Sequence, residues 1–208
     1  MEQNNKMKTT LIGVVLALII GGALGYLVGG IMNNALVKKD SMTNLDTGAA
    51  GTDEWKIQNA MGAAPDAISK DAAVFDWPGK EGAAMRELRK GTNTWTCIPD
   101  WPISPGNDPV CVDEMAMQWF GAYMSQKPPH IAQAGLGYML QGGSSPSNTD
   151  PFATAPKPGE SWMTEPSHIV IFPSSKLDTK IYGTDSTSGK PWVMWAGTPY
   201  EHIMVPVK

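Results

Sequence analysis

Three histidines are the side chains of this chain best suited to bind a metal ion or to act as a catalytic base. His168 opens a strand-like run and His202 directly precedes another, so adjacent strands could bring both imidazoles to one edge of a sheet. Imidazole nitrogens are common zinc ligands, which makes these two residues the candidate metal ligands. A carboxylate such as Glu201, Asp150 or Glu165 could complete the site. No H-E-x-x-H motif is present, and the alternative is that each histidine is hydrogen-bonded separately near the start of its strand.

A serine-rich turn is the segment that comes closest to a catalytic nucleophile. Gly142-Gly143-Ser144-Ser145 lacks the second glycine of a G-x-S-x-G elbow. As an active site it would need one of these serines activated by His168 or His202, with a carboxylate behind the imidazole. Paired carboxylates for glycoside hydrolysis are conceivable in an acidic domain, but no spacing selects a pair. The sequence therefore favours a non-catalytic protein without a cofactor.

Cys97 and Cys111 are the two cysteines of the chain, and they enclose a proline-rich segment. A disulfide between them would close a loop of about 15 residues and stabilise the fold by about 3 kcal/mol in the chain-entropy model. A redox-active or metal-binding pair is disfavoured because the spacing is not C-x-x-C and no histidine lies inside the loop. We predict a structural disulfide, which is typical of an oxidising compartment.

Eight tryptophans are many for a chain of 208 residues. Trp192 and Trp195 lie three apart in an apolar run, so in an extended strand their side chains face opposite sides. One is expected in the core, and the other could join an exposed aromatic patch for a protein partner, a lipid headgroup or a sugar ring. The alternative is that tryptophan, methionine and proline fill an irregular core. The candidate contact residues are Trp101, Trp162, Trp192 and Trp195.

A short echo links two other parts of the chain. Asp76-Trp77-Pro78 recurs as Asp100-Trp101-Pro102. An echo of three residues does not define a repeat, which needs a fixed period of some tens of residues. The sequence indicates a non-repetitive domain.

Residues 9–37 carry no charge and predict a transmembrane helix, because the apolar core Leu11–Met32 would span roughly 33 Å against a hydrocarbon layer of about 30 Å. Small residues recur at a spacing of four and form a row along one helical face, where another helix can approach closely. The partner helix could belong to a second copy or to a different subunit. The row consists of Gly13, Ala17, Gly21, Gly25 and Gly29.

The orientation of this helix depends on the cysteines, because lysines flank both of its ends and the positive-inside comparison nearly balances. We expect a signal anchor with a short cytoplasmic tail at 1–8, a linker at 38–52 and an exported domain at 53–208. That domain would lie on the periplasmic or extracellular side of the membrane. The alternative is a cleaved signal peptide, with small residues at Gly21-Gly22-Ala23 as the cleavage site.

The charge balance argues against nucleic acid as a partner. The chain has 16 basic and 20 acidic residues, and four of its lysines flank the apolar segment, so the exported domain is acidic. Phosphate binding needs clustered basic side chains, and the densest cluster in the domain is Arg86, Arg89 and Lys90.

An α+β domain with an antiparallel sheet, few helices and long Pro/Gly-rich loops is expected from the local patterns. Helices are predicted over Asp53–Ala63, with Thr52 as N-cap, and from Asp113 to before Pro128. Lys90–Asn93 is predicted to turn a hairpin between the second and third strands. The strand-like runs are Val74–Trp77, Met85–Arg89, Trp95–Ile98, Ala134–Leu140, His168–Phe172, Trp192–Trp195 and Ile203–Val207.

Three functional interpretations follow. The first is a non-catalytic accessory or scaffolding subunit of a larger membrane complex, with the proline-rich stretch 142–164 as the contact region. The second is a tethered module that binds a sugar, a small molecule or a metal, which requires a pocket where tryptophan and histidine side chains converge. The third is a tethered hydrolase, which requires a strongly perturbed histidine or carboxylate in that pocket.

Overall fold

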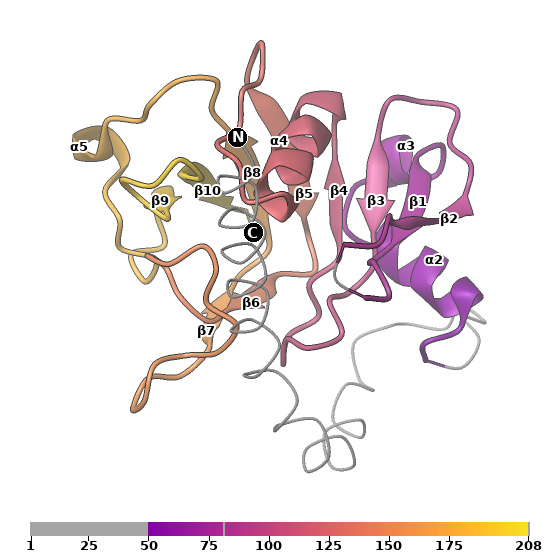
Figure 1. Ribbon diagram of the computed structural model, residues 1–208, viewed down its shortest axis with the longest axis horizontal. Coiled ribbons are helices and arrows are strands. Elements are labelled where there is room, and N and C mark those ends of the chain that lie inside the picture. The colour runs from indigo at the N-terminus through magenta and orange to yellow at the C-terminus, as the bar shows by residue number, and fades with distance from the viewer. Residues whose placement is uncertain (1–49, 81, 208) are drawn as a thin grey trace, which may run out of the picture. The chain divides into compact units, whose positions relative to one another are not determined.

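Residues 50–80 and 82–207 are the part of the chain that the computed structural model describes (Figure 1). They belong to one compact unit, residues 46–208. The expected transmembrane helix, its row of small residues and the linker up to residue 49 lie outside the described residues. The helices within the described ranges do not combine the length and the hydropathy that a membrane span needs.

One eight-stranded sheet runs through the unit in the order β2-β1-β3-β4-β5-β8-β10-β9. Every neighbouring pair is antiparallel except β1 and β3, which run parallel. The predicted sheet-rich domain with few helices is confirmed, although the sheet is mixed rather than wholly antiparallel. Its strands are β1 Ala73–Asp76, β2 Arg86–Arg89, β3 Thr96–Ile98, β4 Val110–Val112, β5 Gly135–Met139, β8 His168–Phe172, β9 Trp192–Met194 and β10 His202–Pro206.

The hairpin predicted through Lys90–Asn93 is wrong, because β1 lies between β2 and β3. Val74 of β1 has Arg89 as its partner on one side and Cys97 on the other. Three of the four residues in β2 are charged, which suits a sheet edge, where charged side chains also discourage pairing with other chains. β3 instead carries buried side chains and takes the inner position.

A second, two-stranded antiparallel sheet pairs β6, Gly143–Ser145, with β7, Met163–Glu165. Neither strand was predicted, because both lie inside the stretch 142–164 that reads as one polar loop. The pairing closes residues 146–162 into a long loop between the two strands. The expected contact region is therefore anchored at both ends.

α2, Asp53–Met61, begins after Thr52 as predicted, and the Thr52 side chain caps its first turn. Two short helices, α3 at Asp66–Ser69 and α5 at Thr179–Tyr182, were not predicted. Each has only four residues, too few to produce a helical pattern of apolar residues.

α4, Glu114–Met124, is the longest described helix and confirms the predicted second helix. The carboxylate of Asp113 accepts hydrogen bonds from the amide of Ala116 at 2.8 Å and from the amide of Leu136 at 3.0 Å. The first bond caps the helix, and the second ties its start to β5. One side chain thus sets where α4 begins and where it sits on the sheet.

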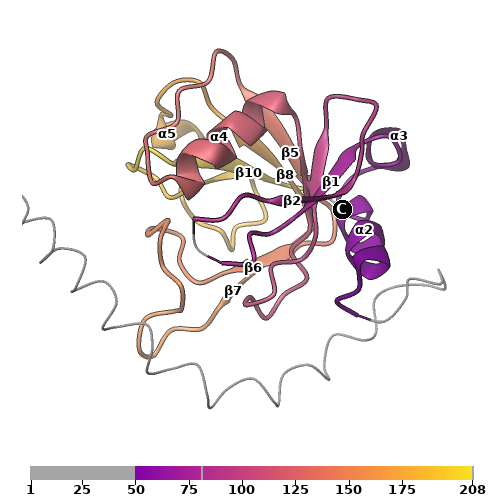
Figure 2. The same cartoon turned by 45° about the vertical axis from the view of Figure 1, so that its right-hand side comes forward.

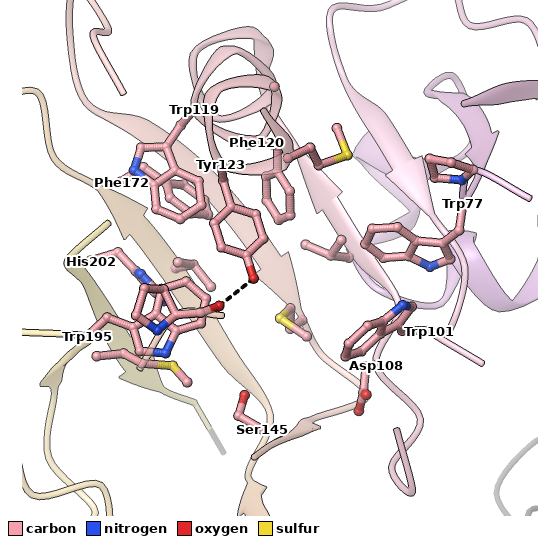
Figure 3. Close-up of a pocket in the computed structure, with 18 of the residues that line it drawn as sticks. Trp77, Trp101, Asp108, Trp119, Phe120, Tyr123, Ser145, Phe172, Trp195 and His202 are labelled. Atoms are coloured by element: carbon pink, nitrogen blue, oxygen red, sulfur yellow. Dashed lines mark hydrogen bonds between the residues drawn. The ribbon is translucent and has the colours of Figure 1, made fainter. Parts of the chain in front are cut away.

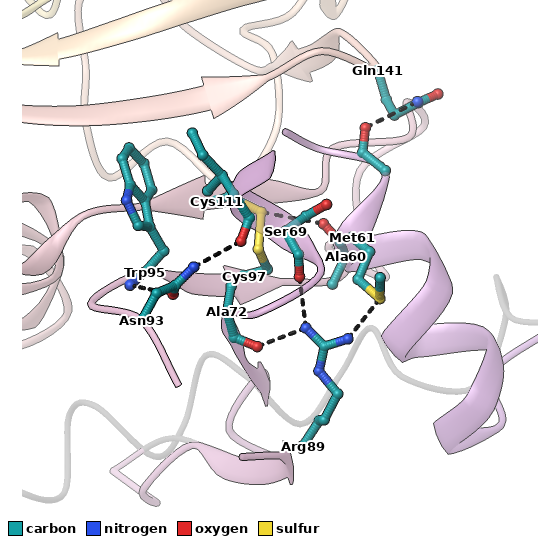
Figure 4. Close-up of a disulfide and its surroundings, with 12 residues drawn as sticks. Ala60, Met61, Ser69, Ala72, Arg89, Asn93, Trp95, Cys97, Cys111 and Gln141 are labelled. Carbon is teal, nitrogen blue, oxygen red and sulfur yellow. Dashed lines mark hydrogen bonds between the residues drawn. A yellow bond between two sulfur atoms is a disulfide. The ribbon is translucent and has the colours of Figure 1, made fainter. Parts of the chain in front are cut away.

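Cys97 on β3 and Cys111 on β4 lie directly opposite each other and form the predicted disulfide (Figure 4). Cys97 lies in the predicted strand-like run Trp95–Ile98, whereas the strand around Cys111 was not predicted. Valines on both sides of Cys111 suit this short buried strand, β4. The disulfide therefore holds residues 98–110 as a closed loop.

The two faces of the sheet carry separate apolar cores, because successive residues of a strand point to opposite sides. On one face, the disulfide packs with Ala60 of α2 and with Val74. On the other, Trp119 of α4 packs among strand residues such as Val112 and Phe172. Figure 2 shows α2 and α4 on opposite sides of the strands.

Candidate functional site

A cavity of about 730 Å³ lies on the α4 side of the sheet (Figure 3). Pockets for small organic molecules typically have volumes of about 300–1,000 Å³. The lining comes from α4, from several strands of the sheet, from β6 and β7, and from the segments that follow β1 and β3. We call this cavity the aromatic cleft, after the rings that line it: Trp77, Trp101, Trp119, Phe120, Tyr123, Phe172 and Trp195.

Trp77 and Trp101, the tryptophans of the two Asp-Trp-Pro segments, form one wall of the cleft. β1 and β3 pair in parallel with Val74 opposite Cys97, so both segments leave the sheet at the same end. The ring centroids of Trp77 and Trp101 are 6.4 Å apart, and the two ring planes are tilted by 49°. Trp77 Nε1 also donates a hydrogen bond to the carbonyl oxygen of Pro99 at 2.8 Å. The two Asp-Trp-Pro segments thus place their tryptophan rings next to each other in one wall of the cleft.

Trp195, Tyr123 and Trp119 form a stack on the opposite wall. The rings of Tyr123 and Trp195 lie 5.5 Å apart with planes 13° from parallel, and those of Trp119 and Trp195 lie 6.4 Å apart at 9°. Tyr123 is fixed at its other end, where its hydroxyl donates to the carbonyl oxygen of Pro151 at 2.7 Å.

Trp195 has a backbone φ of +54°, in the left-handed region that non-glycine residues seldom adopt. Its amide donates to the carbonyl oxygen of Asn148 at 2.9 Å, and its indole Nε1 donates to that of Ser147 at 3.0 Å. These two bonds hold the residue in a strained conformation, of the kind that clusters at functional sites. They also dock the 146–162 loop against the cleft.

Asp108 and Glu165 form the acidic end of the cleft, with exposed fractions of 7% and 5%. A methyl group added at Gly143 would lie 3.0 Å from Glu165 Oε2 and 3.5 Å from Asp108 Oδ1, so both carboxylates flank one backbone position. Ser144 Oγ lies 3.5 Å from Asp108 Oδ1 and donates a hydrogen bond to it. The absence of a side chain at Gly143 leaves room for this arrangement.

The carboxyl group of Glu165 is strongly perturbed by its surroundings. Burial raises its pKa to about 7; a hydrogen bond from Ser145 opposes this rise, and the charge of Asp108 adds to it. Within the described part of the chain, Glu165 Oε1 is buried and has no hydrogen-bond partner. The group can therefore exchange a proton near neutral pH and has an oxygen that remains to be satisfied.

His202 lines the cleft, whereas His168 lies buried outside it. Burial lowers the pKa of His202 to about 4 and also lowers the pKa of His168. Both Nδ1 atoms donate to backbone carbonyl oxygens, of Tyr200 at 2.9 Å and of Pro166 at 2.7 Å. In a Ser-His-Asp triad that nitrogen would donate to a carboxylate, so neither imidazole is oriented as the serine-hydrolase reading requires.

The same two histidines were the candidate metal ligands. β8 and β10 are neighbours, as that reading required, but His168 lies opposite Pro206 and not opposite His202. The two histidines therefore stand at opposite ends of the strand pair. Among residues 50–80 and 82–207, no three His, Cys, Asp or Glu side chains are grouped to hold a metal ion. The geometry gives the metal prediction no support.

Two of the four candidate tryptophans, Trp101 and Trp195, line the cleft. Trp192 is the core residue that we expected of the Trp192/Trp195 pair, because it is only 1% exposed. Trp162 is half-buried and lies outside the cleft lining. Sequence reasoning named Glu165 only as one of three carboxylates that could join a histidine metal site, and it did not select Asp108. Nothing local distinguishes these carboxylates from the others.

Comparisons of the chain with protein-family models, with curated proteins and with solved structures found no match. The chemistry of the cleft is the remaining guide to function. Its aromatic walls can stack on a planar or cationic group, and its acidic end can accept hydrogen bonds or exchange a proton.

Proposed function

We propose that the domain is a tethered module that binds a small organic ligand in the aromatic cleft. The observation that carries this proposal is the convergence of four tryptophans and His202 on one cavity with two buried carboxylates at one end. This convergence is the feature that the ligand-binding interpretation required. An apolar cavity with a few placed polar groups is the usual form of a small-molecule site.

The two walls come from elements with independent support, which favours a preformed site. Trp77 and Trp101 follow paired strands, and Trp195 is held by the loop that contains Ser147. A preformed site loses less conformational entropy on binding than one that must order its side chains.

Binding is tested on the purified full chain with a library of small organic fragments, using ligand-observed NMR and tryptophan fluorescence. We expect fragments with a ring and a polar group to bind. Trp101→Ala should weaken binding at least tenfold, because it removes half of one aromatic wall. The matched control is Trp162→Ala, which removes a tryptophan outside the cleft lining and should leave affinity unchanged. Absence of binding, or equal loss in both variants, would refute the proposal.

A hydrolase remains a second candidate, because Glu165 combines a pKa of about 7 with a neighbouring carboxylate. In this role Glu165 would protonate the leaving group while water attacks the other side of the cleaved bond, with the carboxyl group of Asp108 beside the reacting atoms. Turnover of a bound fragment, detected by mass spectrometry and abolished in Glu165→Gln, would support this reading. Binding without turnover supports the binding module.

The accessory-subunit role stays a prediction, since the row of small residues on which it depends lies outside the described residues. The 142–164 stretch, expected to contact a partner, contributes Pro146, Asp150 and Pro151 to the cleft. A scaffold and a ligand-binding module are compatible roles. Gentle detergent extraction followed by mass spectrometry tests the first: stoichiometric foreign subunits would support it, and a lone monomer or homodimer would count against it.

A further inference from the structure

We propose that the ligand of the aromatic cleft carries a positively charged nitrogen, held by Asp108 and Glu165 against the Trp77–Trp101 wall. This inference rests on the proposed function and names the chemical class of the ligand. Figure 3 shows Trp101 between Trp77 and Asp108, so the aromatic wall and the acidic end adjoin.

The charges that line the cleft favour a cation. Three of the described lining residues are acidic: Asp108, Asp150 and Glu165. His202 is neutral at pH 7, because burial holds its pKa at about 4. Lys80 is the one lysine or arginine of the described lining, and its side chain is exposed. A ligand that carried negative charge would meet repulsion at the buried end of the cavity.

Glu165 lacks the partner that such a ligand would supply. Glu165 is only 5% exposed, and its Oε1 has no hydrogen-bond partner in the described part of the chain. A buried carboxylate is stable in ionised form only when it is paired and hydrogen-bonded. An ammonium group would provide the charge, and a primary amine would also provide the N–H donor.

The aromatic wall supplies the second part of the recognition. Cations bind the negative faces of tryptophan rings, and sites for alkylated ammonium groups are commonly built from several such rings. Trp77 and Trp101 present two tilted faces 6.4 Å apart, next to Asp108. A neutral sugar could also stack on these rings, but it would bring no positive charge to the two buried carboxyl groups.

Matched probes that differ mainly in charge test this inference on the purified full chain. 2-Phenylethylammonium is compared with neutral 2-phenylethanol, and choline with neutral 3,3-dimethyl-1-butanol. We expect each cation to bind at least tenfold more tightly than its neutral counterpart. Glu165→Gln and Asp108→Asn should each reduce that preference severalfold. Glu160→Gln, which changes an exposed glutamate, is the control and should preserve it.

A second readout is the coupling of ligand binding to proton release. A bound cation favours the ionised form of Glu165, so binding should release a proton and tighten as the pH rises from about 6 to 8. The other titratable or charged groups of the described lining are Asp108, Asp150, His202, Lys80 and Tyr123. Titration calorimetry in buffers of different ionisation enthalpy measures the proton release, which should disappear in Glu165→Gln.

The outcomes separate the two proposals. Equal affinity for cationic and neutral probes, or stronger binding of sugars from the fragment library, would overturn the assignment of a cation and leave the binding function intact. Failure of every probe and every fragment to bind would overturn both proposals.

Discussion

At the scale of single residues, the acidic end of the cleft opposes stability. Glu165 is buried beside Asp108 and lacks a partner at Oε1 in the described part of the chain. Apolar side chains of similar volume would be more stable there. The arrangement is understandable if a ligand completes it, because binding energy can offset a locally unfavourable site.

Replacing Glu165 should reveal this cost as a change in pH dependence. The folded-state pKa of Glu165, about 7, lies above the ordinary glutamate value of 4.5, so the folded state binds more protons between these pH values. Stability is therefore lost as the pH rises through this window, by on the order of 3 kcal/mol at pH 8. We expect Glu165→Gln to become more stable relative to the wild type between pH 4.5 and pH 8, measured by urea denaturation.

His202 has the opposite dependence, because its lowered pKa makes stability fall as the pH drops through about 6.5 to 4. That contribution is common to wild type and variant and cancels in their difference. Glu160→Gln serves as the control at an exposed site. A stability difference that does not vary with pH would show that Glu165 titrates normally.

The site residues could be predicted from the sequence only where their type was rare. Tryptophan and histidine stand out in this chain, and Trp101, Trp195 and His202 do line the cleft. The pairing of Asp108 with Glu165 could not be predicted among 20 acidic residues, because their burial depends on distant segments. Their perturbation arises from tertiary contacts and leaves no local mark.

At the scale of elements, the parallel pairing of β1 with β3 is what creates the Trp77–Trp101 wall. The strands themselves could be predicted from alternating apolar residues, and both longer helices from their caps. Strand order could not, because pairing partners are set by long-range contacts. β4, β6 and β7 were missed, since each has three residues and lies next to proline or glycine.

The cap of α4 should be more sensitive to substitution than the cap of α2. Asp113→Ala leaves two backbone amides without their partner, those of Ala116 and Leu136, and should destabilise the domain by about 2 kcal/mol. Thr52→Ala removes one exposed hydrogen bond and should cost about 1 kcal/mol or less. Urea denaturation of both variants measures the contrast. Equal losses would mean that the bond to Leu136 contributes little.

The disulfide should support both stability and binding. Replacing Cys97 and Cys111 together by alanine removes the closure of residues 98–110 and should cost about 3 kcal/mol. Trp101 and Asp108 lie within that loop, so fragment affinity should fall as well. Thermal denaturation and the fluorescence titration measure the two effects. Unchanged affinity in a destabilised variant would show that the loop is held by other contacts, such as the bond from the Asp108 amide to Asp100.

At the scale of the whole molecule, an acidic domain with an aromatic cleft would follow a glycine-rich anchor. The anchor was predicted from length and hydropathy alone, and it lies outside the described residues. A tethered module would keep its ligand close to the membrane surface and raise the local concentration available to a neighbouring protein. This reading connects the binding proposal with the predicted accessory role.

The row of small residues gives that connection a test. Gly21→Ile and Gly25→Ile should weaken association of the full chain while leaving membrane insertion intact, because the added bulk prevents close helix approach without adding charge. Crosslinking in native membranes measures association. Leu27→Ile, a volume-conserving change off the row, is the control. Unchanged association in both glycine variants would refute close packing through this row.

The near-parallel rings of Trp119 and Trp195 have an optical consequence. Their centroids lie 6.4 Å apart with planes 9° from parallel, although one ring belongs to α4 and the other follows β9. Electronic transitions of indole rings at this separation couple, and the coupled excited states give a paired positive and negative band in circular dichroism. The folded chain thus contains an intrinsic exciton signal that reports, without any added label, whether these two distant segments are in contact.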